Sequence, residues 1–317
     1  AEGAMTALLK DAIKPNLVQT LENNPAFVHG GPFANIAHGC NSILATYTAL
    51  SLADWVVTEA GFGADLGAEK FLDTKCRVAG IQPDCVVVVA TVKALKLHGG
   101  ADKASLAQED LAALEKGMPN LYKHIENMKN VYRKPVVVAM NRFATDTPAE
   151  IEAVMRGVAQ AGAEAVFTDV FLQGGAGGEE LAKAVCKAAM QKSELHYSYD
   201  LNDPIEKKIG DIVKNVYGGA GVTFSDLARE KIADAEKRGY GKLPVIIAKT
   251  QYSLSDDAKL LSRPTGFTVH VRDIIVKGGA EFVVAVAGSI MLMPGLGKHP
   301  AAEHIDVDEH GETVGLS

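Results

Sequence analysis

Short apolar runs alternate with amphipathic stretches along most of the chain. Three runs are rich in valine and other apolar residues, at residues 85–91 (CVVVVAT), 135–141 (PVVVAMN) and 163–171 (AEAVFTDVF). Continuous apolar runs between helices are typical of strands in a parallel sheet, where helices cover both faces. We therefore expect a mostly parallel sheet in which residues 85–91 are buried on both faces.

Helical spacing fills the intervals between these runs. Residues 41–54 have helical apolar spacing, and residues 107–129 carry one apolar stripe with members three or four positions apart. The stripe consists of Leu111, Leu114, Met118, Leu121 and Ile125. Thr147, Pro148 and Glu150 have the types and spacing of a capping box, which predicts a helix that begins at Pro148.

The second half of the chain changes character. Helical segments near residues 204–217 and 224–238 lead to apolar runs at residues 243–249, 267–276 and 281–290. Only Lys277 to Ala280 (KGGA) separates the last two runs, so we expect an antiparallel pair of strands. The predicted fold class is α/β, with a smaller α/β domain containing this hairpin after the parallel sheet. We place the boundary in the charged loop 130–134, which gives domains at 1–131 and 132–317.

Composition limits the classes of function. With 47% hydrophobic and 22% charged residues, the 317-residue chain is typical of a globular protein. A net charge of −7 argues against nucleic acid or an anionic membrane as partner, because both require a basic surface. The longest uncharged run, residues 282–297, is broken by glycine and proline and is too short to span a membrane. The four cysteines form no CxxC pair and favour reduced thiols, hence a cytoplasmic protein.

Four glycine-rich loops follow predicted strands or helix ends, at residues 29–32, 59–67, 98–100 and 173–178. Ligands of α/β sheets bind at the carboxyl edge, where such loops present backbone N–H groups. Ordinary glycine turns are an equally good interpretation of the residues alone. The loop at 59–67 is a poor dinucleotide fingerprint because its third glycine comes one residue late, so an NAD(P) enzyme is a weak alternative. No GxxxxGKS or GxxxxGKT occurs in the sequence, so the chain has no P-loop lysine.

Two further patterns suggest ligands. Phe143 and Phe171 fall near predicted strand ends, where two aromatic faces could hold a planar heterocycle, although a core role is the commoner one for such residues. His304, Asp306, Asp308 and His310 alternate like a row of metal ligands. A solvated hairpin tip is the better interpretation of this row, and we predict no metal there.

The sequence closely resembles the formate:tetrahydrofolate ligase family, also called formyltetrahydrofolate synthetase. The resemblance runs from end to end and is carried by long stretches: KDAIKPNL at 10–17, FVHGGPFANIAHG at 27–39, VVTEAGFGADLGAEKF at 56–71, VATVKALKLHGG at 89–100, KTQYS at 249–253 and MPGL at 293–296. Two residues depart from the family pattern. Lys93 stands where arginine is usual, and Phe171 where tryptophan is common.

The resemblance implies an ATP-dependent ligase. In the family, formate attacks the γ-phosphate of ATP to give formyl phosphate, and N10 of tetrahydrofolate takes the formyl group, which leaves ADP and phosphate. ATP with Mg²⁺ and tetrahydrofolate are therefore expected, a monovalent cation is a further candidate, and a homotetramer is implied. Full-length members are nearly twice as long and begin with a P-loop. We therefore expect this chain to be the second part of a P-loop-NTPase-like domain plus a C-terminal domain, and inactive without the N-terminal part.

The resemblance also assigns residues. Around formyl phosphate it places His29, Gly30, Gly31, Asn35, Glu59, Gly61 and Gly63. Glu59 and Asp65 are candidates for binding a cation or orienting the amine, and His98 for carrying a proton, with a structural role at a helix end as its alternative. Phe143 and Phe171 would stack pterin or adenine, and Asn141, Thr145 and Asp146 would contact the nucleotide base. The alternative for the whole chain is a folate- or nucleotide-binding fragment, or a split subunit, without chemistry of its own.

Overall fold

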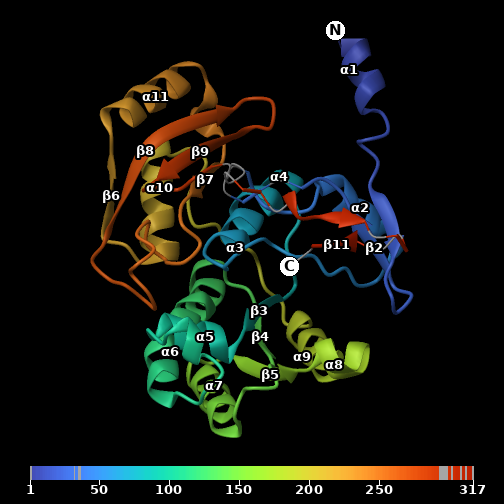
Figure 1. Ribbon diagram of the computed structural model, residues 1–317. Coiled ribbons are helices and arrows are strands. Elements are labelled where there is room, and N and C mark those ends of the chain that lie inside the picture. The colour runs from blue at the N-terminus through green and yellow to red at the C-terminus, as the bar shows by residue number, and fades with distance from the viewer. Residues whose placement is uncertain are drawn as a thin grey trace.

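The computed structural model describes residues 2–31, 33–34, 37–292, 299–300, 303–307, 309–310 and 313–315 (Figure 1). Two α/β units, each built on its own sheet, lie on either side of a helical run in the first third of the chain. A segment from the N-terminus and a short hairpin near the C-terminus complete the described chain. No helix among these residues is long and apolar enough to cross a membrane.

The first unit is a parallel sheet of β3 (Val86–Ala90), β4 (Val136–Asn141) and β5 (Glu164–Thr168), in that order. One face is covered by α5 (Val92–His98), α6 (Leu111–Glu126) and α7 (Pro148–Gln160), and the other by α9 (Glu179–Ala189), with α8 (Val170–Gln173) beside it (Figure 1). The predicted strands, the helix start at Pro148 and its capping box are confirmed. Within the predicted stripe, Leu114, Met118, Leu121 and Ile125 are core, while Leu111 is partly exposed.

The prediction that β3 is buried on both faces is wrong. Val88 and Ala90 are buried, but Val87 and Val89, on the opposite face, are 39% and 66% exposed. The reason lies in the packing: α9 contacts β4 and β5, and β3 is the edge strand of the described sheet. A valine-rich edge strand with one bare face is unusual in a parallel sheet, whose faces are normally both covered.

The second unit is a mixed sheet in the order β6 (Gly221–Phe224), β8 (Thr268–Lys277), β9 (Phe282–Ala287) and β7 (Val245–Ala248). The predicted antiparallel pair is confirmed as β8 and β9, whose connection is residues 278–281. Helices α10 (Ile205–Ile212) and α11 (Asp226–Lys237) pack on one face, and Ala37 from an N-terminal loop packs on the other.

A helical run from residue 67 to 79 separates the two units and consists of α3 (Gly67–Lys70), a π-helical turn (Phe71–Cys76) and α4 (Arg77–Ala79). Similar π-helical turns end α6 at Asn127–Val131 and α10 at Val213–Tyr217. We call residues 67–79 the central helix. The sheet of β3, β4 and β5 crosses the predicted domain boundary at residue 131, and the division into two domains at that point stays a prediction.

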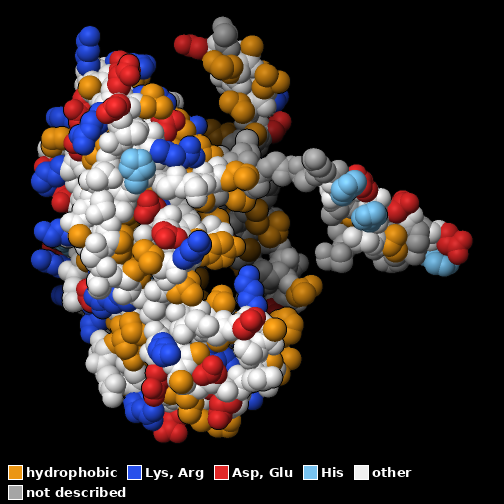
Figure 2. Space-filling model, turned by 60° about the vertical axis from the view of Figure 1, so that its left-hand side comes forward, with side chains coloured by type: hydrophobic (Ala, Val, Ile, Leu, Met, Phe, Trp, Pro, Cys, Tyr) orange, Lys and Arg blue, Asp and Glu red, His pale blue; other side chains and the backbone are white. Residues whose placement is uncertain are grey.

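The remaining elements contribute little core. They are α1 (Glu2–Leu9), the hairpin of β1 (Asn16–Gln19) and β2 (Pro25–Val28), α2 (Ile43–Leu52), three short 3-10 turns (Lys103–Ser105, Gly174–Gly178, Tyr240–Lys242) and a hairpin of β10 (Asp306–Val307) and β11 (Thr313–Val314). None of the residues in α1 or β1 is buried. Figure 2 shows the N-terminal segment projecting from the body of the molecule, with exposed hydrophobic side chains along it.

Candidate functional site

Two of the glycine loops pack directly against each other. We call residues 29–40 the first loop and residues 59–67 the second loop. The backbone N–H of Gly61 donates to the carbonyl of Gly39 at 3.1 Å, and Cys40 and Ala60 form an isolated antiparallel bridge. A Cβ on Gly67 would lie 2.1 Å from the Gly61 oxygen, so only glycine permits this approach. The two loops therefore form one backbone-lined unit at the start of the central helix.

The other two glycine loops have packing roles. A Cβ on Gly99 would lie 1.7 Å from the carbonyl oxygen of Ala113, so Gly99 lets α5 and α6 touch. In the fourth loop, a Cβ on Gly177 would lie 2.4 Å from the carbonyl oxygen of Asp169. Close helix and turn packing accounts for both glycines, which is the structural interpretation left open by the residues alone.

His29 is held through both ring nitrogens. Nε2 lies 2.9 Å from the carbonyl oxygen of Ala12, which can only accept, so Nε2 carries the proton. Nδ1 then accepts from the Ser42 hydroxyl at 2.6 Å. Gly30 has a positive φ of 68°, and a Cβ on Gly31 would meet nothing within 4 Å. The tip of the first loop is thus open, while Asn35 lies outside the described residues.

The two acids predicted in the second loop have opposite settings. Glu59 is exposed and makes no hydrogen bond or ion pair with any residue that the structure describes. Asp65 is 5% exposed and forms an ion pair of 2.7 Å with the fully buried Lys249. Burial acts to raise the pKa of Asp65, but Lys249 outweighs it and holds that pKa below its ordinary value. Asp65 therefore anchors the second loop to the end of β7, and only Glu59 remains accessible to a ligand.

Glu69, one turn beyond Asp65, is a buried acid without donors. Its side chain is fully buried, and neither carboxylate oxygen has a hydrogen-bond partner among the described residues. Burial raises the pKa of Glu69 well above its ordinary value, and the nearby Asp73 and Asp65 add to this effect. Isolated buried carboxylates are costly when ionised, so the surroundings of Glu69 favour its protonated form.

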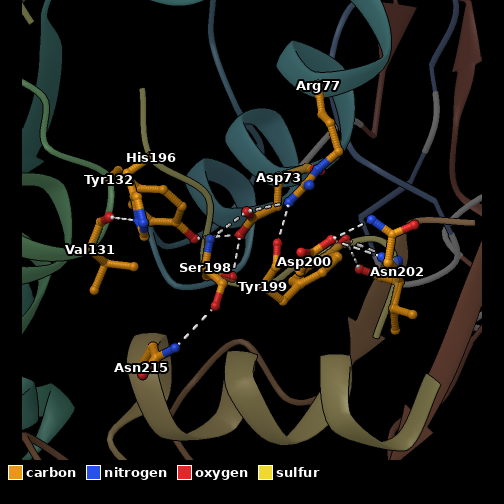
Figure 3. Close-up of polar contacts among 11 residues, drawn as sticks. Asp73, Arg77, Val131, Tyr132, His196, Ser198, Tyr199, Asp200, Asn202 and Asn215 are labelled. Atoms are coloured by element: carbon orange, nitrogen blue, oxygen red, sulfur yellow. Dashed lines mark hydrogen bonds and ion pairs between the residues drawn. The ribbon is translucent and has the colours of Figure 1, made fainter. Parts of the chain in front are cut away.

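Asp73, one turn further, is the hub of a polar network (Figure 3). It accepts hydrogen bonds from the Tyr132 hydroxyl at 2.9 Å and from the Ser198 backbone and hydroxyl at 2.9 and 2.6 Å. Arg77, which forms an ion pair of 3.4 Å with Asp73, also donates to the Tyr199 carbonyl at 2.9 Å. Because Ser198 and Tyr199 lie in the segment between α9 and α10, the network fixes both units to the central helix.

His98 makes a contact of the structural kind that the sequence offered as its alternative. Its Nδ1 accepts from the backbone N–H of Ser262 at 3.1 Å, which requires the neutral ring. Burial lowers the pKa of His98 further, although Asp65 opposes this. The ring thereby ties the end of α5 to the loop that follows β7.

The carboxyl edge of the first sheet carries exposed aromatic rings. Phe143, just beyond β4, is 40% exposed, and Phe171, on α8 after β5, is 89% exposed, so the core alternative is wrong for both. The Lys93 ammonium lies 4.3 Å from the centre of the Phe143 ring. Asp146 is buried and accepts from the Phe143 backbone N–H at 2.8 Å. Asn141 is half-buried at the end of β4, and Thr145 is exposed. A planar ligand can therefore reach this edge.

Cations also gather at the opposite, amino edge of the first sheet. Lys129, Arg133, Lys134 and Lys192 line a hollow of about 400 Å³ there. Lys129 donates to the carbonyl oxygens of Ala161 and Gly162 at 3.2 and 2.7 Å, at the end of α7. Helix carboxyl ends carry partial negative charge, so Lys129 stabilises the end of α7.

Comparison with known sequences decides the family. The sequence model of the formate–tetrahydrofolate ligase family matches residues 1–317. The formate–tetrahydrofolate ligase of Psychrobacter sp. (strain PRwf-1) is 58% identical over 320 residues, which cover 100% of this chain and 56% of that relative. The chain belongs to the formate–tetrahydrofolate ligase family. It spans about half the length of the curated relative that it matches.

Three features of this family member were missed by sequence reasoning. Phe33 and Phe62, one from each loop, are both exposed and meet edge to face at 6.4 Å, and Phe62 has the unusual φ of 65° for an aromatic residue. Glu69 and the two buried lysines Lys70 and Lys75 were also overlooked. A signal existed for the acids, since Asp65, Glu69 and Asp73 recur every four residues and thus share one helix face.

The predicted absence of a metal concerns partly undescribed residues. Asp308 lies outside the described residues, whereas His304 precedes β10, Asp306 is in β10 and His310 lies between β10 and β11. Within the described ranges no three His, Cys, Asp or Glu side chains are grouped so as to hold a metal ion. The MPGL stretch at 293–296 also lies outside the described residues.

Proposed function

We propose that the chain forms the folate-binding and anion-binding part of an enzyme that joins formate to tetrahydrofolate with ATP. The observation that carries this proposal is the match of the whole chain to the formate–tetrahydrofolate ligase family, with 58% identity to the Psychrobacter ligase. The reaction is the formation of formyl phosphate and ADP, followed by attack of N10 on the formyl carbon. The products are 10-formyltetrahydrofolate and phosphate.

The paired glycine loops are the proposed site of formyl phosphate. Their backbones approach closely at Gly39, Gly61 and Gly67, and the first loop is open around Gly31. Backbone N–H groups held in such a frame can donate to phosphate or formyl oxygens as charge develops. Glu59 is the accessible acid beside this frame and is proposed to orient the amine or a monovalent cation. His29 could contact formyl phosphate only if a ring nitrogen left its present partner.

The exposed rings of Phe143 and Phe171 are the proposed stacking platform. Both stand at the carboxyl edge of the first sheet, where ligands of α/β proteins bind. A pterin or adenine ring between two aromatic faces gains dispersion and quadrupole energy without any hydrogen bond. Asn141, Thr145 and Asp146 follow β4 at the same edge and are proposed to contact the polar rim of the ring.

Mg²⁺ is proposed to arrive with ATP. The described residues offer no group of three acids or histidines for a metal, so no residue of this chain is assigned to Mg²⁺. Asp65 is paired with Lys249 and is not proposed as a cation ligand. The homotetramer and the cytoplasmic location implied by the resemblance also stay predictions.

A second polypeptide segment is proposed to complete the site. The sequence contains no GxxxxGKS or GxxxxGKT to hold ATP phosphates. The bare valines of β3 and the exposed Leu44, Leu50 and Trp55 near α2 are surfaces that such a segment would cover. The matched relative has the additional length to supply it.

An assay of 10-formyltetrahydrofolate formation tests this function. The purified chain is supplied with formate, Mg²⁺-ATP and tetrahydrofolate, alone and mixed with the P-loop-bearing part of a family member. We expect no turnover by the chain alone and clear turnover by the mixture. Robust turnover by the chain alone would refute the two-part site, and tetrahydrofolate binding without turnover in either case would favour a binding fragment.

A further inference from the structure

Two lysines of the central helix are buried without a carboxylate partner. Lys70 is 0% and Lys75 3% exposed, and neither forms an ion pair with any residue in the described ranges. The Lys70 ammonium donates to the carbonyl oxygen of Ala34 in the first loop. The Lys75 ammonium donates to the Thr46 hydroxyl at 2.9 Å. Buried ammonium groups are rare unless paired, so each demands an explanation.

The neighbouring acids form no ion pair with them. Asp65 is engaged by Lys249 at 2.7 Å, and Asp73 by Arg77, Tyr132 and Ser198. Glu69, the remaining acid on that face, has no hydrogen-bond donor among the described residues, and burial raises its pKa well above the ordinary value. Neither ammonium group forms an ion pair among the described residues, and the charges of Glu69 and Asp65 favour the charged form of Lys70 without pairing with it.

Both ammonium groups lie against the first loop. Lys70 is bonded to that loop at Ala34, and Thr46, the partner of Lys75, belongs to α2, which follows the loop directly. Burial lowers the pKa of His38 in this loop, and the charges of Lys75 and Lys70 lower it further, so their field reaches the loop backbone. Backbone N–H groups are dipoles and bring no net charge to an anion.

We propose that Lys70 and Lys75 supply the positive charge of the anion site at the paired glycine loops, so that this site takes a phosphate-type dianion. The inference rests on the proposed function, because it assigns a charge source to the site proposed for formyl phosphate. It explains how a chain without a P-loop lysine stabilises such a ligand. An anion bound at the loops would compensate the charge of these two buried ammonium groups, for which burial alone is unfavourable.

The pH dependence of binding distinguishes this role from a structural one. Burial lowers the pKa of Lys70 to about 8, with Glu69, Asp65 and Cys40 opposing and Lys249 assisting that shift. Below pH 8 the ammonium is charged and attracts the anion, and above pH 8 it is neutral. Anion affinity should therefore fall as the pH rises through about 8.

Sulfate is a suitable probe because its charge does not change between pH 7 and pH 9. Calorimetric titration of the full chain with sulfate should show affinity falling about tenfold across that range. Lys70→Met should lose roughly tenfold to a hundredfold in affinity at pH 7, as expected when a charged hydrogen-bond donor is removed. Lys75→Met should lose less, because the Lys75 ammonium is bonded to Thr46 of α2 and not to the first loop itself. Lys103→Met, at an exposed lysine, is the matched control and should bind like the wild type.

Each outcome of the titration supports or overturns the proposal. If Lys70→Met folds and binds sulfate like the wild type, or if wild-type affinity does not change with pH, the assignment of Lys70 is wrong while the glycine-loop site stands. If the wild-type chain binds no sulfate at all, the anion site itself is wrong. Should Lys70→Met fail to fold by circular dichroism, the pH profile of the unmodified chain still distinguishes a charge-supplying lysine from a structural one.

Discussion

Two fully buried glutamates, Glu150 and Glu69, lie in opposite environments. Glu150 accepts from Lys96 at 2.8 Å and from the backbone N–H groups of Asp110 and Thr147. Glu69 accepts from nothing among the described residues. Burial acts to raise the pKa of both, but at Glu150 the hydrogen bonds from Lys96 and the two backbone groups outweigh it, so that pKa is lowered.

The difference separates a cluster whose buried charges are paired from one that lies beside the proposed binding site. Around Glu150 every buried charge has its partner, and the cluster joins α5, α6 and α7. Around Glu69 the chain keeps an unpartnered acid and two unpaired lysines beside the glycine loops. Unsatisfied buried groups are tolerated where a ligand or a proton completes them, and they are expected at functional sites.

The largest effect is expected at the satisfied cluster. Glu150→Ala leaves the Lys96 ammonium buried without a carboxylate and removes the capping box of α7, which should cost about 3 to 5 kcal/mol of unfolding free energy. Denaturant unfolding measures it. Glu152→Ala, in the exposed pair with Arg156 on the same helix, is the control and should cost under about 0.5 kcal/mol. Equal costs for the two variants would contradict the comparison.

A smaller loss is expected at Asp65. Asp65→Asn removes the negative charge that faces Lys249, whose other acceptors are the carbonyl oxygens of Thr250 and Ser253, and about 3 kcal/mol should be lost at neutral pH. The pKa of Asp65 is lower in the folded chain than in the unfolded chain, so Asp65 contributes fully to the unfolding free energy above its unfolded pKa. This contribution disappears as the pH falls through the folded pKa. The difference between variant and wild type should accordingly shrink in acid. A difference that stays constant with pH would exclude an ionised Asp65.

Glu69 should behave in the opposite sense. Its raised pKa means that the folded chain keeps a proton which the unfolded chain releases above about pH 4.3. Unfolding free energy should therefore fall with rising pH by up to about 1.4 kcal/mol per unit from this group, and Glu69→Gln should remove that slope. Thermal unfolding of both proteins between pH 5 and pH 8 compares the slopes. Parallel slopes would show that Glu69 is ionised.

The smallest effect concerns the stacking platform. Phe171→Trp restores the commoner family residue and enlarges the aromatic face, so affinity for tetrahydrofolate should rise by about twofold to fivefold. Fluorescence titration measures the change. Leu172→Trp, at the neighbouring exposed position on α8, controls for an added indole and should leave affinity unaltered. A gain of the same size at position 172 would remove Phe171 from the site.

The sequence predicted helices and strands better than it predicted which side chains are buried or exposed. The valine runs, the capping box at Thr147 and the hairpin of β8 and β9 were confirmed, because local periodicity and cap chemistry determine them. The bare face of β3 was not foreseen, since it depends on how far α9 extends over the sheet. Exposure of Phe143 and Phe171 was likewise undecided until the packing around them was known.

The sequence predicted the loops of the candidate site but not the contacts between them and distant residues. The loop motifs pointed to an anion site, but the sequence could not show that Asp65 pairs with Lys249, 184 positions away. Nor could it show that Gly99 and Gly177 serve packing, because the need for glycine there comes from a distant backbone oxygen. Partners far apart in the sequence require the tertiary structure.

Titration of the purified chain with tetrahydrofolate tests the central claim most directly. If the chain carries the folate part of the ligase site, it should bind tetrahydrofolate saturably, and the double variant Phe143→Leu with Phe171→Leu should lose tenfold or more in affinity, about 1.4 kcal/mol. Absence of binding by the wild-type chain, or unchanged binding by the folded double variant, would contradict it.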